Sequence, residues 1–240
     1  MNLCIDQGNS RTKIGIFDQD KLVHSFSGKS PTTDDYSAII EEWNIDSCIL
    51  SSVTGEDAWL GKKLRKNTQN VVELTHNTPI PIKNNYRTPE TLGKDRLAAV
   101  VGASFLKPDT DLLVIDAGTA ITYDFIETGK IYRGGNISPG IDMRLRALHE
   151  FTKKLPYAEA SADSPLMGED TKSALVSGAL YGIVFEMDGY INTLKAKYPL
   201  LSTFLTGGSF FYFYNKLKNP IFAENNLVLI GLNRILQYNV

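Results

Sequence analysis

The sequence predicts an α/β protein built from two similar lobes. Two observations support this class: strand-like and helix-like segments alternate along the first half, and one short pattern at the start of the chain returns near its middle. Strands that alternate with helices pair in parallel and form layered α/β structures. At 240 residues the chain is long enough for one large domain or two modest ones.

The first half begins with strand patterns and continues with alternating helices and strands. Strands are expected at residues 2–6, 13–18 and 22–27, because turn residues separate these apolar runs. The elements expected next are a helix at 34–43, a strand at 48–52, a helix at 57–66 and a strand at 71–74. A loop rich in Pro, Asn and Thr (77–91) then leads to a helix at 93–106.

The second half restarts with a hairpin at 121–131 and a glycine-rich segment, 133–140, which is expected to open a helix to about residue 154. The elements expected after it are a loop at 155–168, a helix at 170–197, a strand at 203–206, a helix after Gly207-Gly208 and a last helix at 226–238. We therefore expect an N-terminal lobe of residues 1–108 and a C-terminal lobe of residues 109–240, facing each other across a cleft.

The composition is that of an ordinary globular protein, with 42% hydrophobic residues, 22% charged residues and a formal net charge of -2. No basic excess indicates nucleic acid, and no apolar run is long enough to predict a membrane span. The N-terminus lacks a signal-peptide pattern, and both cysteines lie in apolar segments, so we expect core thiols and a cytoplasmic protein. The histidines are not at zinc-ligand spacing.

The repeated pattern is the most informative feature. Aligning residues 3–12 with residues 113–122 pairs Asp6 with Asp116, Gly8 with Gly118 and Thr12 with Thr122. A strand that ends in Asp-x-Gly presents a carboxylate, a glycine and turn N–H groups, which suit a phosphate chain with its cations. Each aspartate could instead cap a hairpin turn, but the pair in matching contexts favours a ligand.

Two such hairpins resemble the phosphate-1 and phosphate-2 loops of the acetate and sugar kinase, Hsp70 and actin superfamily, whose RNase H-like lobes clasp ATP. The order and spacing of further motifs resemble type III pantothenate kinases from residue 2 to the closing Gly231-Leu232 segment. The motifs that carry this resemblance are Asp6-Gln7-Gly8-Asn9-Ser10, Gly93-Lys94-Asp95-Arg96, Asp116-Ala117-Gly118-Thr119-Ala120, Gly134-Gly135-x-Ile137-x-Pro139-Gly140, Leu155-Pro156, Gly168-x-x-Thr171 and Thr206-Gly207-Gly208. Ser10 replaces the threonine usual in that family and keeps its hydroxyl.

The resemblance implies transfer of the ATP γ-phosphoryl group to pantothenate, which gives 4'-phosphopantothenate in the first step of coenzyme A biosynthesis. Asp95 is then the expected catalytic base, and Asp116 the ligand of a monovalent cation, K⁺ or NH₄⁺. Mg²⁺ should accompany ATP, and the protein should be a homodimer. The ATP-binding residues implied are Asp6, Gln7, Gly8, Asn9, Ser10, Arg11, Thr12, Lys13 and Thr119. The pantothenate-binding residues implied are Tyr86, Gly93, Lys94, Asp95, Arg96 and Thr171.

Alternatives remain open at several positions. Asp95 could complement a helix dipole, Arg96 could form a surface ion pair, and Thr171 could simply be an early helix residue. The aromatic run at 209–214 is more typical of core or interface than of an adenine platform. The apolar residues at helical spacing within 170–197 suit either a dimer interface or the core.

Two other functions also fit the scaffold: a nucleotide-binding regulatory protein, of the accessory transcription factor kind, or a kinase for another small hydroxylated substrate. Intact Tyr86, Asp95 and Arg96 argue against the regulatory protein.

Overall fold

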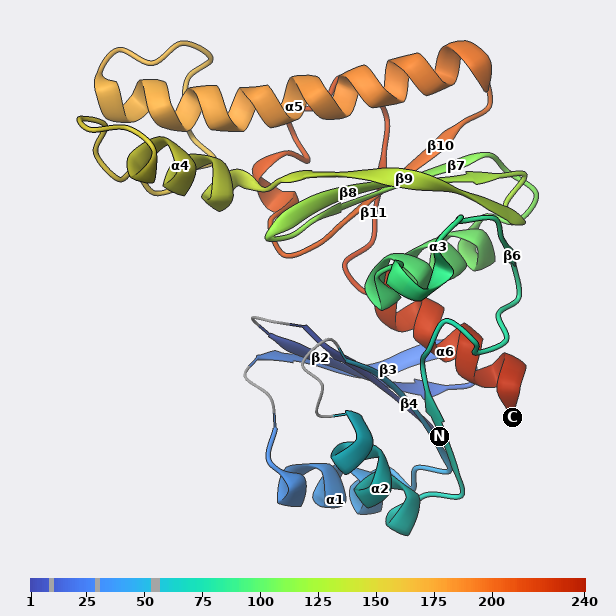
Figure 1. The fold of residues 1–240 in the computed structure, drawn as a ribbon. Helices are drawn as coiled ribbons and strands as arrows, with labels where there is room; N and C mark the ends of the chain where they lie inside the picture. The colour runs from blue at the N-terminus through green and yellow to red at the C-terminus, as the bar shows by residue number, and fades with distance from the viewer. Residues whose placement is uncertain (9–10, 29–30, 53–56) are drawn as a thin grey trace. The chain divides into compact units, whose positions relative to one another are not determined.

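The computed structural model describes residues 1–8, 11–28, 31–52 and 57–240, which form two compact units (Figure 1). The first unit comprises residues 1–109, 128–133 and 226–240, and the second comprises residues 110–127 and 134–225. Strand β9 (Ile131–Pro139) begins in the first unit and ends in the second. By its contacts the C-terminal helix belongs to the first unit, while the division into functional lobes at residue 108 stays a prediction.

The first unit is built on a five-stranded sheet in the order β3-β2-β1-β4-β5. Its strands are β1 (Asn2–Gln7), β2 (Thr12–Asp18), β3 (Lys21–Gly28), β4 (Ser47–Ser52) and β5 (Asn70–Glu73). The hairpins β1–β2 and β2–β3 are antiparallel, whereas β4 pairs parallel with both β1 and β5. Helices α1 (Thr33–Glu42) and α2 (Asp57–Asn67) cover one face, where Leu3, Ile5, Leu50 and Leu64 form the core (Figure 1).

Two helices cross on the other face of this sheet. Helix α6 (Leu227–Asn239) contacts β1, β2 and β4, and α3 (Lys94–Leu106) packs on α6. Glycine makes this crossing possible, because a Cβ atom on Gly231 would lie 1.8 Å from the Ala98 carbonyl oxygen. A Cβ atom on Gly102 would lie 2.4 Å from the Leu227 carbonyl oxygen. The two backbones therefore touch with no side chain between them.

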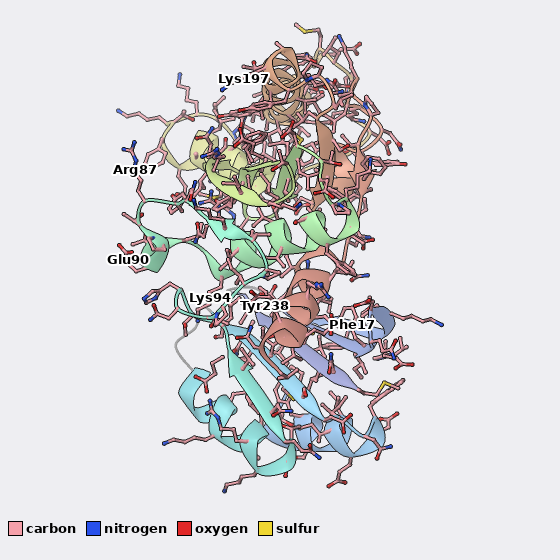
Figure 2. The ribbon with its side chains drawn as sticks, turned by 90° about the vertical axis from the view of Figure 1, so that its right-hand side faces the viewer. Phe17, Arg87, Glu90, Lys94, Lys197 and Tyr238 are labelled. Atoms are coloured by element: carbon pink, nitrogen blue, oxygen red, sulfur yellow. The ribbon has the colours of Figure 1, made fainter. Side chains whose placement is uncertain are left out.

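The loop before α3 also belongs to the first unit. Its short strand β6 (Lys83–Asn84) pairs parallel with the first residues of β9. A 3₁₀ turn, η1 (Pro89–Thr91), then leads into α3. Arg87 and Glu90 point outward from this segment (Figure 2).

The second unit repeats the plan of the first. Its strands belong to a six-stranded sheet in the order β11-β10-β7-β8-β9-β6, in which β6 is contributed by the first unit. The strands of the second unit are β7 (Leu112–Ala117), β8 (Ala120–Glu127), most of β9, β10 (Ser202–Thr206) and β11 (Phe222–Ala223). As in the first unit, the two strands of the Asp-x-Gly hairpin are antiparallel, and the next two pairings are parallel. Helices α4 (Ile141–Glu150) and α5 (Thr171–Lys197) lie over one face (Figure 1). Apart from the added edge strand β6, the strands of the two sheets correspond, as the sequence repeat predicts.

Helix α5 supplies core rather than a free apolar face at the predicted positions. By length and composition alone it could cross a bilayer, but half of its most apolar window is buried in the second unit. The residues at helical spacing are all buried in the core of this unit, namely Val176, Leu180, Ile183, Val184, Met187 and Ile191. The core alternative is therefore correct for these residues.

The glycine-rich segment 133–140 opens helix α4 as predicted, with Gly140 as the N-cap, but its residues up to Pro139 also form strand β9 beside β8. Two other local predictions are wrong. The helix predicted after Gly208 is only a 3₁₀ turn, η2 (Phe210–Tyr212). Phe213 then enters the core, and Asp188 accepts hydrogen bonds from the main-chain N–H groups of Lys218 and Asn219, so the segment folds back on α5. Helix α4 ends at Glu150, four residues early.

Both cysteines are core thiols, as predicted. Cys4 and Cys48 are free and buried. Burial raises the pKa of the Cys48 thiol to about 12. Neither residue therefore carries a reactive thiolate near neutral pH.

Candidate functional site

The first Asp-x-Gly hairpin joins β1 to β2. Asp6 lies opposite Lys13 in β2 and beside Ser51 in β4, whose hydroxyl donates to Asp6 Oδ1 at 3.4 Å. The Gly8 N–H donates to the Arg11 carbonyl at 3.0 Å and closes the turn. Gln7 and Thr12 flank the turn and are buried. The predicted ATP contacts Asn9 and Ser10 lie outside the described residues.

The second hairpin is similar but one residue shorter. Gln7 pairs with Thr12 in the first hairpin, whereas Ala117 pairs with Ile121 in the second. The residue opposite Asp116 is therefore Thr122. The ungapped alignment of Thr12 with Thr122 is thus wrong beyond the turn, because Thr122 is the structural equivalent of Lys13. Asp6 is therefore paired with a lysine on the neighbouring strand, whereas Asp116 is paired with a threonine.

Three motifs of the second unit meet around Asp116. The Gly140 N–H donates to the Thr119 carbonyl at 3.0 Å, and a Cβ atom on Gly140 would lie 2.5 Å from the Gly118 carbonyl oxygen. Gly207 has a φ of 98°, and a Cβ atom there would lie 2.4 Å from Asp116 Oδ1. Only glycine allows these approaches. The motifs at 116–120, 134–140 and 206–208, far apart in sequence, therefore form one cluster.

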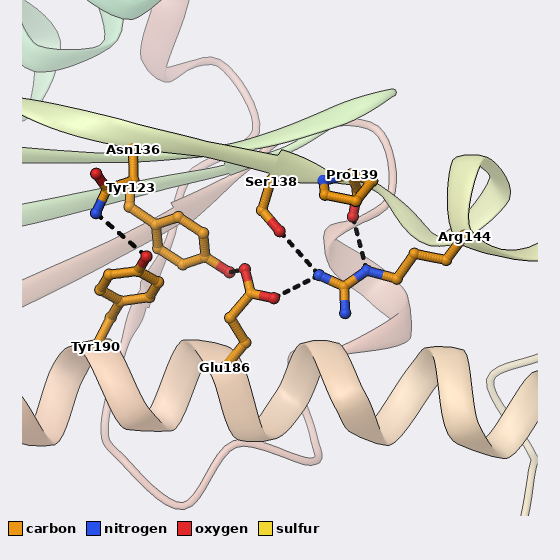
Figure 3. A network of polar contacts seen from close by, with 7 residues as sticks. All are labelled: Tyr123, Asn136, Ser138, Pro139, Arg144, Glu186 and Tyr190. Atoms are coloured by element: carbon orange, nitrogen blue, oxygen red, sulfur yellow. Dashed lines mark hydrogen bonds and ion pairs between the residues drawn. The ribbon is translucent and has the colours of Figure 1, made fainter. Parts of the chain in front are cut away.

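A polar network fixes the start of α4 beside this cluster (Figure 3). The Arg144 guanidinium donates to the Pro139 carbonyl and the Ser138 hydroxyl, each at 2.9 Å, and to Glu186 Oε2 at 2.5 Å. The Tyr123 hydroxyl donates to Glu186 Oε1 at 2.8 Å. Burial opposes ionisation of Glu186, but these donors outweigh burial and lower its pKa. Burial, followed by the bond to Glu186, raises the pKa of Tyr123.

The predicted substrate segment gathers at the first turn of α3. The Lys94 ammonium donates to the Ser52 carbonyl at 2.9 Å. It therefore ties this turn to the end of β4, the strand that pairs with β1, which carries Asp6. Asp95 is exposed, and its Oδ1 accepts the Arg96 N–H at 2.8 Å. A Cβ atom on Gly93 would lie 2.5 Å from that same oxygen. Glycine at position 93 therefore leaves the space that the Asp95 carboxylate occupies.

Arg96 is buried, with 6% of its surface exposed, so the surface ion-pair alternative is wrong. Its Nη2 donates to the Tyr132 hydroxyl at 3.1 Å, and its Cζ lies 5.6 Å from the centre of the Tyr86 ring. Tyr86 and Arg96 are thus brought together as predicted. The sequence analysis missed Tyr132, because an aromatic residue in a strand pattern is typical of core.

Thr171 belongs to the second unit and is the first residue of α5. Asp170 caps this helix by accepting the N–H groups of Lys172 and Ser173 at 2.8 and 3.0 Å. The bonds from Ser173 and Lys172 lower the pKa of Asp170. Thr171 is exposed beside this cap. The other predicted substrate residues belong to the first unit.

The motifs, their spatial clusters and the paired sheets can be compared with known proteins. A structure from Campylobacter jejuni, described provisionally as a Baf family transcriptional activator, is similar with a TM-score of 0.62, 24% identity and coverage of 99% of this chain and 98% of that one. The polyphosphate/ATP-glucomannokinase of Arthrobacter sp. strain KM is similar with a TM-score of 0.50 and 15% identity, over 99% and 98% of the chains. These likenesses concern the fold alone, and they confirm the predicted two-lobe α/β fold class.

Sequence comparison is more specific. The chain is 49% identical to a type III pantothenate kinase of Phocaeicola vulgatus, over 100% of this chain and 99% of the relative. The family model described as type III pantothenate kinase matches residues 2–193, a range that holds both Asp-x-Gly hairpins and the first turn of α3. Since that match covers most of the chain and the relative matches along its whole length, this protein belongs to the type III pantothenate kinase family.

Proposed function

We propose that this chain transfers the γ-phosphoryl group of ATP to the primary hydroxyl of pantothenate, with Asp95 as the base that takes the hydroxyl proton. The observation that carries this assignment is the first turn of α3, where Gly93 leaves room for an exposed carboxylate beside buried Arg96. Phosphoryl transfer depends mainly on positioning and charge stabilisation, with one group to accept the proton of the nucleophile. A carboxylate on a well-anchored helix turn suits that role.

The ATP phosphates are assigned to the two hairpins. In the first, the proposed ligands are residues 6–13, including the Lys13 ammonium, although residues 9 and 10 lie outside the described part of the chain. Thr119 is the proposed ligand from the second. Nests of main-chain N–H groups and a lysine are common phosphate ligands. Mg²⁺ bound with ATP would neutralise phosphate charge, and the carboxylate of Asp6 is an oxygen ligand of the kind it prefers.

Asp116 is assigned to the monovalent cation, K⁺ or NH₄⁺. Among the described residues no group of three acidic, histidine or cysteine side chains could hold a metal ion by itself. A cation at Asp116 would therefore share main-chain carbonyls, water or phosphate oxygens. The surroundings fit, because a Cβ atom on Gly207 would lie 2.4 Å from Asp116 Oδ1 and 2.5 Å from the Ala117 carbonyl oxygen, so these two oxygens lie close together. Thr122 pairs with Asp116 on the neighbouring strand.

Replacing Asp116 with asparagine should raise the K⁺ concentration needed for half-maximal activity by about tenfold, since losing one charged ligand costs on the order of 1.4 kcal/mol. The measurement is initial rate against KCl concentration at saturating ATP and pantothenate. Asp163→Asn, which neutralises an exposed loop carboxylate in the same unit, is the control. An unchanged K⁺ requirement in the Asp116 variant would refute the assignment.

The homodimer is assigned to a surface formed by α4 and α5, with Met143, Phe151, Gly178 and Phe185. Met143, Phe151 and Phe185 are 45%, 85% and 56% exposed. Met143, Phe151 and Gly178 line a groove of about 550 Å³, and Phe185 follows Gly178 by two helical turns. Exposed apolar side chains gathered in this way are typical of protein interfaces. A second copy of the chain is the occupant that we propose.

Phe185→Glu should convert the dimer to monomer, because a buried charge without a partner opposes association. Sedimentation velocity of the purified variant is the measurement. Leu200→Glu is the control, since Leu200 is 85% exposed and follows the end of α5. A dimer that survives Phe185→Glu would place the interface elsewhere.

The function itself is tested by one assay. Purified protein is incubated with ATP, Mg²⁺ and pantothenate, with and without K⁺, and 4'-phosphopantothenate is sought by mass spectrometry. We expect product that depends on all three and increases with K⁺. Absence of product under every cation condition would refute the pantothenate kinase assignment.

The cytoplasm is the proposed location, in line with two free, buried cysteines.

A further inference from the structure

Tyr132 lies in β9, in the part of that strand that belongs to the first unit, and its side chain is fully buried. We infer that Tyr132 is a positioning residue of the pantothenate site: its main chain holds the segment that carries Tyr86, and its hydroxyl holds Arg96. This inference rests on the proposed function, since it concerns the same substrate residues.

The main chain of Tyr132 holds the segment that carries Tyr86 through the pairing of β6 with β9. Asn84 pairs with Tyr132 in parallel register, and the Asn85 N–H donates to the Tyr132 carbonyl at 3.0 Å. One residue later, the Tyr86 N–H donates to the Asn84 side-chain oxygen at 2.9 Å. The backbone of Tyr86 is therefore fixed relative to Tyr132 by consecutive hydrogen bonds.

The side chains of Tyr86, Arg96 and Tyr132 lie together in one stacked group. The Tyr86 and Tyr132 rings are nearly parallel, with centres 6.0 Å apart and an interplanar angle of 17°. The Arg96 Cζ lies 5.6 Å from the centre of the Tyr86 ring, and Arg96 Nη2 donates to the Tyr132 hydroxyl at 3.1 Å. Tyr132 thus contacts Tyr86 with its ring and Arg96 with its hydroxyl.

These contacts determine what the site presents to a substrate. An arginine has many rotamers, and the hydrogen bond to Tyr132 and the contact with the Tyr86 ring both favour the rotamer in which the guanidinium faces Tyr86. A guanidinium with a fixed plane recognises an oxyanion better than a freely rotating one. The two oxyanions available in this reaction are the substrate carboxylate and the transferred phosphoryl group. Tyr132 also holds Tyr86, which is a proposed pantothenate ligand, so we expect Arg96 to bind the substrate carboxylate.

The test is Tyr132→Phe, which removes the hydroxyl but keeps the ring and the main-chain hydrogen bond from Asn85. We expect the KM for pantothenate to rise roughly tenfold, the usual consequence of losing a hydrogen bond to a charged group. The kcat and the KM for ATP should stay within about twofold. A shift confined to the KM for ATP would mean that Arg96 serves the phosphoryl group, and it would overturn the inference.

Tyr36→Phe separates positioning from stability. Tyr36 is a tyrosine of the same unit, 4% exposed, in the core of α1, α2 and the sheet. Both variants remove a buried tyrosine hydroxyl and keep its ring, but only Tyr132→Phe should change the KM for pantothenate. If the control raises that KM equally, the effect of Tyr132→Phe is structural and the positioning role is wrong.

Arg96→Lys completes the design. If Tyr132 acts through Arg96, adding Tyr132→Phe to Arg96→Lys should change the KM for pantothenate by less than about twofold. Additive effects of the two substitutions would overturn the inference. Its failure can be told from failure of the proposed function. A wild-type protein that forms no 4'-phosphopantothenate overturns both, whereas an active wild type with an unchanged KM in Tyr132→Phe overturns the positioning role alone.

Discussion

Asp95→Asn is expected to lower kcat for pantothenate phosphorylation by roughly 10²–10⁴-fold, the usual contribution of a positioned general base. Asparagine keeps the size of the side chain and its acceptor oxygen, so the contact of position 95 with the Arg96 N–H can persist. It cannot accept the proton of the substrate hydroxyl. The measurements are steady-state kinetics for both substrates, together with ATP affinity by calorimetry.

The matched control is Glu90→Gln. Glu90 is an exposed carboxylate a few residues before α3, and it points outward from its segment (Figure 2). Its neutralisation should leave kcat within about twofold of wild type, as expected for a surface charge away from the reacting atoms. ATP affinity should be retained in both variants. Near-normal turnover in Asp95→Asn would transfer the base role to another residue.

Gly231→Ala is expected to give the largest loss of stability, about 3 kcal/mol or more, by overpacking the crossing of α3 and α6. The added Cβ atom would lie 1.8 Å from the Ala98 carbonyl oxygen and 2.9 Å from the Gly102 nitrogen, and both are backbone atoms that cannot rotate away. The helices must separate to accommodate it. The measurement is urea denaturation of the variant and the wild type, with the midpoint and slope compared.

Gly189→Ala gives the opposite expectation from the same substitution. Gly189 also lies within a helix, but a Cβ atom there meets no heavy atom within 4 Å. Alanine has the higher helix propensity, so this variant should gain roughly 0.5–1 kcal/mol. Equal stability of Gly231→Ala and wild type would mean that the helices cross less closely than described.

The sequence was sufficient to predict the strands of the first sheet, three strands of the second (β7, β8 and β10) and most helices. The alternation of apolar residues in strands and their spacing of three to four residues in helices are clear in these segments. The repeat of Asp6 at Asp116 predicted two similar units, and the matching strand orders confirm it. The pairing register of the second hairpin was less predictable. One residue is missing from the second turn, and only the pairing of strands reveals that Thr122, rather than Tyr123, stands where Lys13 stands in the first hairpin.

The candidate site was predictable where a motif is contiguous and unpredictable where it depends on distant partners. Gly93, Asp95 and Arg96 are adjacent, so their pattern could be recognised in the chain. Tyr132 contributes through a strand pairing with Asn84, and Ser52 through a carbonyl that any residue would offer to Lys94. Neither leaves a mark in local composition. The course of the chain after Gly208 was missed for a related reason, since Asp188 of α5 binds the main chain of Lys218 in this segment.

The two hairpins differ in the residue that is paired with the aspartate, and this difference can give the two similar units different ligands. The acidic residue is the same in both copies, so it does not by itself decide what each copy can hold. The neighbour on the adjoining strand differs: a lysine ammonium accompanies the first aspartate, whereas an uncharged threonine hydroxyl accompanies the second. Exchanging the two neighbours would redistribute ligand preference between the halves while both turns kept their acids.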